Sequence, residues 1–481
     1  MTLAIQDNLE NSSQAQSILC KASLLRCPSC QSIDMSNSGT HIHCQNCNID
    51  YPFIGNKENK IPFLFANKNS AWQGWVARLN GFNKQLLEKN LLLEKSLSDK
   101  KNSKLSIARI KKIIRANQIY KAQVEELLVD FGQGDFEHNM NANKSLAKNQ
   151  GVDSYINNIF RDWCWNNGEN KEMLSALNSV VPEKIFSAGK VLGLGSGASR
   201  LLVDFQQQHN IDHCVLLDIN PLLLNIANNI IHGEEVDLIE FPTAPTSMND
   251  YAVMQTCKLP DEYKADEQGD FEFILADATN IPFADKAFNT IVTPWLIDIL
   301  PINFRDFIPH INRLLPVGGY WLNTGSLAFF YHNDVLNYSQ EEVLDLLKKY
   351  GFEVVSSNRQ NINYLHSPHS AHGRIESVFN FCVRKKHDCV PPNSFEYFPD
   401  WINDTSAIIP KSEELFVSSS KHLLQAQILS AIDGVRSSDD IAMLIAKEYD
   451  MPLPSASAAV RQILIDNYSF CLLYTSDAAD E

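Results

Sequence analysis

Short apolar runs alternate with helical stretches between residues 150 and 386, and this alternation predicts an α/β domain with a parallel sheet. The first of these runs, Lys190 to Leu194, leads into a glycine-rich turn and then into a helical stretch. A second run, Cys214 to Leu217, ends on Asp218. The order of strand, glycine turn, helix, strand and acid is that of a nucleotide-binding βαβ unit.

The glycine turn contains Gly193, Gly195 and Gly197, which let the backbone approach a ligand closely. Asp218 lies 218 − 197 = 21 positions after the last glycine, near the ~20 that place an acid on a ribose. Because Ala198 completes a dinucleotide fingerprint, a dehydrogenase that binds a nicotinamide cofactor is one alternative. A turn or helix cap also uses glycine, so the strands and the acid are what favour a nucleotide.

The later runs favour a different cofactor. Five blocks resemble the class I S-adenosylmethionine-dependent methyltransferases, which have a Rossmann-like fold. They read VLGLGSG, LLD, ADATNIPF, NTIVTPWLID and LLPVGG. The resemblance implies that Asp277 holds the adenine amino group and Asp218 the two ribose hydroxyls. It also places the glycine turn, Ala278 and Pro294 at the cofactor. One departure is Gly193, because the family usually has an acid there that helps to place the methionine end.

A narrower resemblance spans roughly residues 150 to 386. Five segments resemble blocks of the carnosine N-methyltransferase family and follow one another in the same order. They are the RDW segment at Arg161, WLID at 295–298, PVGGYWLNTGSLAFFYH, YSQEEVLDLLKKYGFEV and a closing strand. The resemblance implies that Asn158 and Arg161 reach the carboxylate end of the cofactor, which would compensate for Gly193. The alternative for Arg161 is a surface salt bridge with Asp162.

The same resemblance implies an acceptor site made of Asp298, His332 and Tyr364, which would grip an imidazole dipeptide. Two departures are a histidine two residues farther from its glycine and Glu376 near the position of a second tyrosine. Otherwise His332 is an ordinary polar residue, and Asp298 caps a helix beginning near Pro301. We interpret the three histidines of YLHSPHSAHG as loop or substrate-lid residues: His366, His369 and His372.

Two CxxC pairs lie near the start of the chain, and thirteen residues separate them: Cys27, Cys30, Cys44 and Cys47. Four thiolates on two tight turns predict one structural, tetrahedral zinc site that folds a small ribbon. His41 and His43 are alternative ligands, although four cysteines already fill such a site. The ribbon, with its YPF…IPFLF tail, resembles the zinc-ribbon activator subunit of some tRNA and protein methyltransferases.

Composition narrows the class of partner. A net charge of −16 over 481 residues disfavours nucleic-acid and anionic-membrane partners. The start lacks the layout of a secretory signal, and no apolar run approaches the ~18 residues of a membrane span, which predicts a cytoplasmic protein. In that setting the other cysteines are expected to be packed thiols rather than disulfides; they include Cys164, Cys214, Cys257, Cys382 and Cys389.

Six segments are expected: a zinc ribbon at 20–66, a helical segment and linker at 71–150, the methyltransferase domain at 151–386, a linker at 387–411, a helical module at 412–470, and 471–481. The module resembles a winged-helix peptide-binding domain, or else a plain three-helix unit, and could take a peptide or protein partner. The final CLLYTSDAADE matches a translated sequencing adapter, so the true C-terminus is expected to be missing.

The sequence therefore predicts an S-adenosylmethionine-dependent N-methyltransferase acting on an imidazole-containing small molecule or peptide. Two alternatives are a protein or tRNA methyltransferase recruited through the ribbon and a non-catalytic scaffold.

Overall fold

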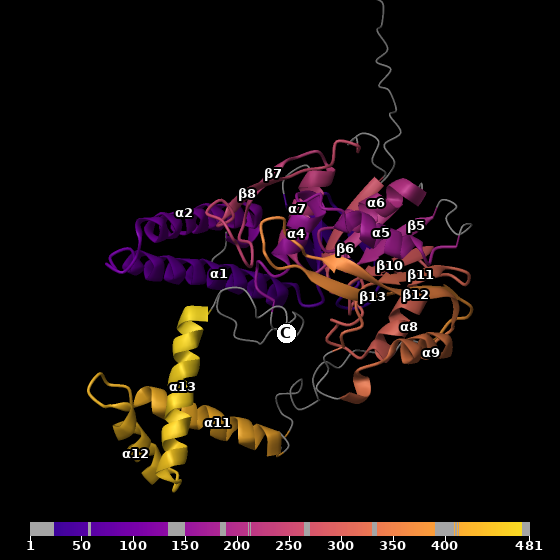
Figure 1. The fold of residues 1–481 in the computed structure, drawn as a ribbon. Helices are drawn as coiled ribbons and strands as arrows, with labels where there is room; N and C mark the ends of the chain where they lie inside the picture. Colours follow the sequence, from indigo (N-terminus) through magenta and orange to yellow (C-terminus); the bar gives the residue numbers. More distant parts are fainter. Residues whose placement is uncertain are drawn as a thin grey trace, which may run out of the picture. The chain divides into compact units, whose positions relative to one another are not determined.

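A computed structural model describes residues 24–55, 59–132, 150–182, 189–209, 211, 213–263, 270–329, 334–389, 408, 411 and 413–473. The chain divides into two compact units, Met1–Phe395 and Glu396–Glu481. The first contains the sheet and the candidate site (Figure 1).

An eleven-stranded sheet organises the first unit, in the order β1-β2-β3-β4-β9-β6-β5-β10-β11-β13-β12. Its central strands are parallel: β4 Ile61–Leu64, β9 Asp270–Ala276, β6 His213–Asp218, β5 Lys190–Leu194, β10 Thr290–Pro294 and β11 Tyr320–Thr324. Two long antiparallel strands close one end: β13 Arg374–Lys385 and β12 Phe352–Tyr364. The predicted α/β, Rossmann-like class I fold is confirmed.

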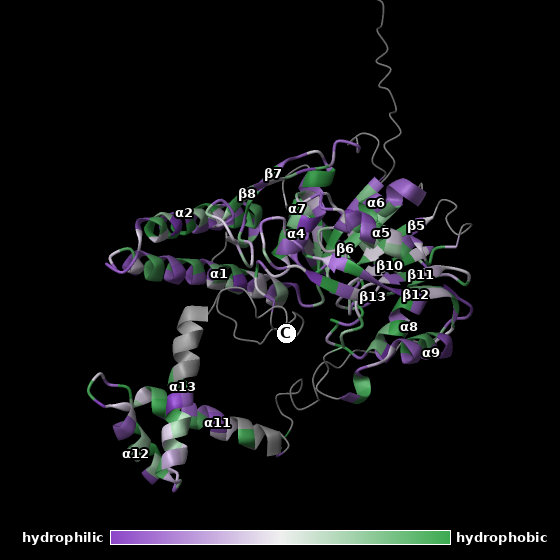
Figure 2. Cartoon of the chain, viewed as in Figure 1, coloured by the Kyte–Doolittle hydropathy of each residue, from purple (hydrophilic) through white to green (hydrophobic). Residues whose placement is uncertain are grey.

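Six helices connect or flank these strands within the described residues: α4 Ile156–Trp163, α5 Glu169–Asn178, α6 Arg200–His209, α7 Pro221–Ile231, α8 Phe304–Leu314 and α9 Gln340–Lys349. Of these, α6 is the helical stretch predicted after the glycine turn. Local capping fixes where several begin. Asn220 accepts from two backbone N–H groups of α7, whose first residue is a proline. Ser339 and Glu342 form a capping box on α9, whose polar and apolar residues alternate in colour in Figure 2.

The ribbon joins the sheet directly. It consists of β1 Met35–Asn37, β2 His41–Cys44, β3 Ile49–Ile54 and β4, and β4 pairs in parallel with β9. Phe63 and Phe65 of the ribbon belong to the same buried cluster as the core of the methyltransferase sheet. The ribbon and the sheet therefore share one core, and the boundary expected near residue 66 falls between β4 and α1.

The helical segment forms a pair, α1 Lys68–Ser96 and α2 Lys104–Leu127, followed by the short α3 Val129–Gly132. The apolar face of the pair packs into the shared core through Trp75 and Tyr120. In the basic stretch, Lys112 donates to the backbone oxygens of Met248 and Asn249. The linker expected up to residue 150 lies mostly outside the described residues.

Two hairpins border the carboxyl edge of the sheet. One is the separate two-stranded sheet β7 Val236–Glu240 and β8 Val253–Cys257. The other is β12–β13, whose connecting loop, residues 365–373, reaches the first hairpin because Ala371 N donates to Ala244 O at 2.9 Å. Loop and hairpin together cover the region beside α4.

The second unit contains three helices, α11 Glu413–Ser430, α12 Ser438–Glu448 and α13 Leu453–Leu473, and no strand within residues 413–473. A small core that includes Ile428, Ile441 and Val460 joins them. Residues 474–481 of the suspected adapter segment lie outside the described part of the chain. Within the described residues no helix is long and apolar enough to cross a membrane.

Candidate active site

The glycine turn and Asp218 form the first part of the site. Gly195 and Gly197 have positive φ values of 70° and 56°, a conformation that glycine adopts without strain. The turn brings Gly197 N to within 2.8 Å of Asp218 Oδ2, while Asn220 N donates to Oδ1 at 2.9 Å. Burial raises the pKa of Asp218, and these backbone donors partly oppose the shift. The acid at the tip of β6 is therefore held in a fixed orientation.

Gly193 lies one strand position before the turn, and its missing side chain would point into apolar packing. A Cβ there would come within 3.0 Å of Leu202 and 3.1 Å of Leu216. A carboxylate at this position would need both leucines to move. The structure thus gives a steric reason for the departure noted in the sequence, and it makes Gly193 a packing position next to the turn.

Asp277 begins the loop after β9. Its Oδ1 accepts from Thr279 N at 2.8 Å and from Thr279 Oγ1 at 2.6 Å. Burial raises the pKa of Asp277, and the two threonine donors lower it in part. Both bonds end on one oxygen, so the other oxygen can accept from a ligand. The next residue, Ala278, is buried.

The RDW segment of α4 docks against the glycine turn. Trp163 Nε1 donates to Ala198 O at 2.9 Å, and Asp162 Oδ2 accepts from Arg200 N at the start of α6 at 3.4 Å. Arg161 donates through Nε to Asp162 Oδ1 at 2.7 Å. The expected ion pair exists, but it is buried rather than on the surface, since Arg161 is 6% exposed and Asp162 3%.

Three polar atoms beside this helix are buried without a hydrogen-bond partner among the described residues: Asn158 Oδ1, Arg161 Nη1 and Glu169 Oε2. We call these residues the α4–α5 cluster. Buried polar groups are normally paired, and one unpaired donor together with two unpaired acceptors is a set that a zwitterionic ligand would satisfy. Burial alone would lower the pKa of Arg161, but Asp162 and Tyr364 outweigh it and raise the pKa.

Glu169 was not recognised in the sequence. It is 2% exposed, and its Oε1 accepts from His366 N at 3.2 Å. Burial raises the pKa of Glu169, and the His366 N–H and Arg161 oppose the shift. The available signal was positional, because Glu169 lies on the same helix face as the buried Met173 and Leu177.

The end of β10 forms the wall facing this cluster. Pro294 ends the strand, and Trp295 follows with a positive φ of 51°. Trp295 N donates to Thr324 O at 2.8 Å, and this close approach requires a glycine at Gly325, where a Cβ would lie 2.9 Å from the Trp295 backbone. The Trp295 ring lies 4.4 Å from the Tyr364 ring, measured between centroids.

Tyr364 connects the acceptor residues with α4. The Cζ atoms of Arg161 and Arg374 lie 5.9 Å and 4.6 Å from its ring centroid, which is within reach of a cation–π contact. Trp295 Nε1 is a further buried donor without a partner among the described residues. The structure therefore places Tyr364 beside Trp295 and Arg161, and its role at an acceptor stays a prediction. His332 lies outside the described residues, and its placement stays a prediction too.

Asp298 is 6% exposed and lies four residues after Pro294. Its Oδ2 accepts from Ser326 Oγ and from Ala328 N, the latter at 2.9 Å. Burial raises the pKa of Asp298, and these two donors oppose the shift. The expected alternative of a helix cap is wrong, because α8 begins at Phe304 and Asn303 caps it.

The histidine loop, residues 365–373, is anchored to the β7–β8 hairpin. His369 Nδ1 lies 3.1 Å from Asp250 Oδ1, and Ser367 Oγ donates to the fully buried Glu240. Glu240 also accepts from Trp165 Nε1 at 3.1 Å. The loop thus borders the α4–α5 cluster, and a role of its histidines as a substrate lid stays a prediction.

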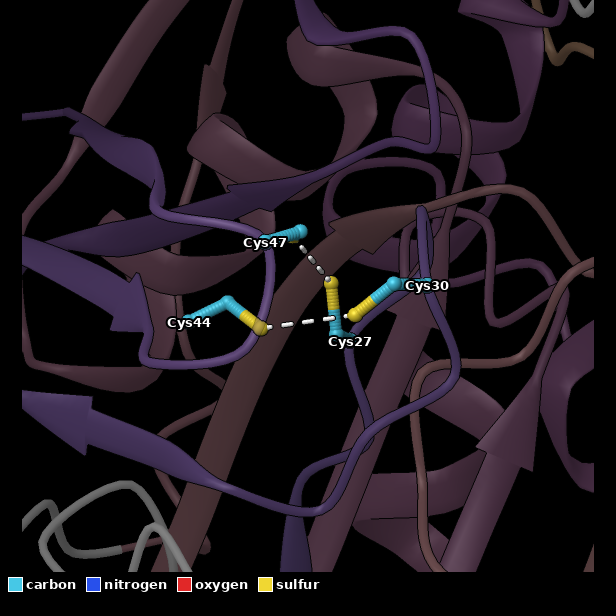
Figure 3. Close-up of side chains that lie close together, drawn as sticks. All are labelled: Cys27, Cys30, Cys44 and Cys47. Carbon is cyan, nitrogen blue, oxygen red and sulfur yellow. Dashed lines mark hydrogen bonds between the residues drawn. The ribbon is translucent and has the colours of Figure 1, made fainter.

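The four cysteines converge in the ribbon (Figure 3). Their sulfur atoms all lie within 4.8 Å of one another, and the pairs Cys27–Cys47 and Cys30–Cys44 are each separated by 3.6 Å. Four sulfurs at ~2.3 Å from a central zinc would be about 3.8 Å apart, so the quartet fits a tetrahedral metal. His41 and His43 instead group with Asp50.

The ribbon also contacts the loop that begins at Asp277, which we call the adenine-side loop after the role that the family resemblance implies for Asp277. Arg26 N donates to Pro282 O at 3.0 Å, and Asn280 Nδ2 donates to Pro28 O at 2.8 Å. Pro28 lies between Cys27 and Cys30, so the first cysteine turn is bonded to the loop that begins at Asp277.

Fold and site together define a class I S-adenosylmethionine-dependent methyltransferase, as predicted. Residues 138–387 match the family model described as carnosine N-methyltransferase, and because this span is more than half of the chain, the chain belongs to that family. A relative named carnosine N-methyltransferase, from Schizosaccharomyces pombe, is 22% identical over 322 residues, which cover 58% of this chain and 81% of the relative.

Two solved structures are similar at a low level. The N-methyltransferase NodS from Bradyrhizobium japonicum, in complex with S-adenosyl-L-homocysteine, is 13% identical with a TM-score of 0.30, covering 47% of this chain and 91% of that one. A methyltransferase-like protein from Bacillus halodurans is 14% identical with a TM-score of 0.31, and the match covers 45% of this chain and 100% of that one. Scores of this size decide nothing further about this chain.

Proposed function

We propose that this chain transfers the methyl group of S-adenosylmethionine to a ring nitrogen of an imidazole-containing small molecule or peptide of the carnosine type. The observation that carries the proposal is Asp298, a buried carboxylate after β10 whose two hydrogen bonds both end on Oδ2. Oδ1 is then the acceptor available to an imidazole N–H.

The cofactor would lie across the carboxyl edge of the sheet, where ligands bind in open α/β folds. Asp218 would accept from the ribose hydroxyls and Asp277 from the adenine amino group. The glycine turn, Ala278 and Pro294 would line the remaining nucleotide surface. At the other end, Arg161 would donate to the α-carboxylate while Asn158 and Glu169 accept from the α-ammonium.

The chemistry that the cofactor supplies is an electrophilic methyl group on a sulfonium. The residues of this chain have to orient the acceptor and exclude water. A neutral imidazole is nucleophilic at one nitrogen when the other carries the proton. By accepting from that N–H, Asp298 would select the tautomer and stabilise the ring as it becomes positive.

Aromatic and basic groups would hold the rest of the acceptor. The tilted aromatic pair of Tyr364 and Trp295 would pack against an imidazole ring, and Arg374 beside Tyr364 would pair with an acceptor carboxylate. His332 would complete this side of the site, as the family resemblance implies.

We also propose that the cysteine quartet binds one structural zinc and that the ribbon acts within the same chain as a support for the cofactor site. The sulfur geometry and the hydrogen bonds from Arg26 and to Pro28 support this role. For the second unit we propose a peptide or protein partner.

The substitution Asp298→Asn tests the acceptor site. The amide can keep the contacts with Ser326 and Ala328, but it can present an N–H where the imidazole needs an acceptor. We expect turnover with carnosine to fall about 100-fold, a typical loss when a positioned polar group is removed, with S-adenosylhomocysteine affinity nearly unchanged in calorimetry.

Asp306→Asn is the matched control, because Asp306 lies in the first turn of α8 and is half-exposed. It should leave turnover and affinity as they are. Normal turnover in Asp298→Asn would show that the acceptor does not depend on this carboxylate.

A further inference from the structure

Two cysteines outside the metal quartet lie in unusually close contact. Cys164 caps the C-terminal end of α4, and Cys257 is the last residue of β8, 257 − 164 = 93 positions later. Their sulfur atoms are 2.7 Å apart. Non-bonded carbon atoms pack at about 3.5–4.0 Å and sulfur is larger, so two separate thiols are crowded at this distance.

The surrounding contacts hold the two segments together. Lys258 N donates to Trp163 O at 3.5 Å, which links the residues next to each cysteine. On one side Trp163 is tied to the glycine turn through Ala198 O, and on the other Trp165 is tied to Glu240 of β7. These bonds keep the two backbone segments side by side, so the two cysteines remain neighbours in the folded chain.

We infer that Cys164 and Cys257 are a dithiol oxidation site that reacts with low-molecular-weight disulfides and forms a reversible bond between α4 and β8. The Cys164 thiolate attacks one sulfur of the small disulfide, forms a mixed disulfide and releases one small thiol. The Cys257 thiolate then attacks the Cys164 sulfur and releases the second. The two cysteines lose two electrons and two protons, and the small disulfide becomes two thiols.

The order of attack follows from accessibility. Cys164 is partly exposed, whereas Cys257 is fully buried, so the small disulfide reaches Cys164 first. The pKa of Cys257 lies well above its ordinary value because its thiol hydrogen-bonds Cys164 and is buried. The closing step should therefore accelerate as pH rises.

The reaction can be followed on the folded full-length chain. The protein is incubated with oxidised glutathione, free thiols are alkylated, and the digested peptides are analysed by mass spectrometry. The expected product is a crosslink between the peptides containing Cys164 and Cys257, which reduced glutathione reverses. Cys214 and Cys382 are internal controls, because each is buried and pairs with no other sulfur among the described cysteines; both should be alkylated only after unfolding.

The inference is overturned if Cys164 accumulates as a stable glutathione adduct while Cys257 stays a thiol, or if neither cysteine is oxidised. As a second measurement, oxidation should raise the melting temperature by about 5 °C or more, because the bond closes a long loop in the unfolded chain. Cys164→Ser should abolish both crosslink and shift, whereas Cys382→Ser should keep both. A shift that survives in Cys164→Ser would also contradict the assignment.

Discussion

The two ends of the proposed cofactor site are built differently. At the nucleotide end, Asp218 and Asp277 already accept hydrogen bonds from the protein, from Gly197 and Asn220 in one case and from Thr279 in the other. At the amino-acid end, the α4–α5 cluster keeps Arg161 Nη1 and Glu169 Oε2 buried and unpaired within the described residues. The nucleotide end is thus preorganised by the chain, whereas the amino-acid end requires a ligand to complete its hydrogen bonds.

Two ligands can separate these ends experimentally. S-Adenosylhomocysteine carries the nucleoside and the amino acid, while 5′-methylthioadenosine carries the nucleoside alone. A residue of the nucleotide end should matter for both ligands, and a residue of the amino-acid end only for the first.

The largest effect should come from removing the metal. We expect about one zinc per chain by metal analysis. The double substitution Cys27→Ser and Cys44→Ser should abolish it, because structural zinc sites contribute about 10–16 kcal/mol of apparent binding energy. The adenine-side loop then loses its bonds to the cysteine turn, so affinity should fall for both ligands in calorimetry.

The matched control is His41→Gln with His43→Gln, since these histidines lie outside the cysteine quartet. That variant should keep its zinc and both affinities. Zinc retained in the cysteine double variant would rule out the quartet as the ligand set, and unchanged ligand affinity without zinc would separate the ribbon from the cofactor site.

The next largest effect should come from Arg161→Met. The loss of a charged donor should weaken S-adenosylhomocysteine about 100-fold, since hydrogen bonds to charged groups contribute about 1.5–3 kcal/mol. Affinity for 5′-methylthioadenosine, measured in the same calorimetric series, should change little and also shows that the nucleotide end remains folded. Glu169→Gln should reproduce part of this pattern. An equal loss for both ligands would place Arg161 outside the amino-acid end.

Asp218→Ala and Asp277→Ala should each lower the affinity for both ligands by roughly tenfold. This change lies within the ~1–3 kcal/mol that is lost when a buried hydrogen-bond partner is removed. Thr279→Val is a useful companion, because it removes the hydroxyl that donates to Asp277 but keeps the carboxylate. Its effect should be smaller than that of Asp277→Ala. If both alanine variants bind normally, the nucleotide lies elsewhere.

The smallest effect concerns stability and pH. Burial raises the pKa of Asp298 in the folded state, so its contribution to folding is fully present below the unfolded pKa of about 3.9 and is lost as pH rises through the folded value. The asparagine side chain does not titrate, so Asp298→Asn does not lose this stability as pH rises. The melting temperature of the variant minus that of the wild type should therefore increase as pH rises from 4 toward neutrality. A difference in melting temperature that stays constant with pH would contradict the prediction.

Local patterns in the sequence were enough to predict that Asp218 and the glycine turn lie next to each other. Asp218 and the glycine turn belong to one βαβ unit, so strand periodicity and spacing place them together, and the α/β fold was predicted for the same reason. Glu169 carries no such signature, because its partners Arg161 and His366 come from other elements. The partners of Asp298 lie 28 and 30 positions away, at Ser326 and Ala328, and only the folded chain brings them together.

The Cys164–Cys257 contact is another feature that local sequence patterns could not predict, because the two residues are even farther apart along the chain. The sequence predicted packed thiols rather than disulfides for both residues, and nothing in the spacing of 93 residues suggests a pair. The crowding arises because α4 packs against β8, which depends on the whole arrangement of the sheet and its hairpins.

The pairing of β4 with β9 has a consequence for how the protein can be handled. Without the ribbon, β9 would be an outer strand with unpaired backbone groups, an edge that favours association with other chains. A fragment starting near residue 150 would retain the cofactor residues but expose this edge and the apolar surface under Phe63 and Phe65. We therefore expect such a fragment to aggregate when the full-length chain does not, and soluble fragments for structural work should begin before the first cysteine turn.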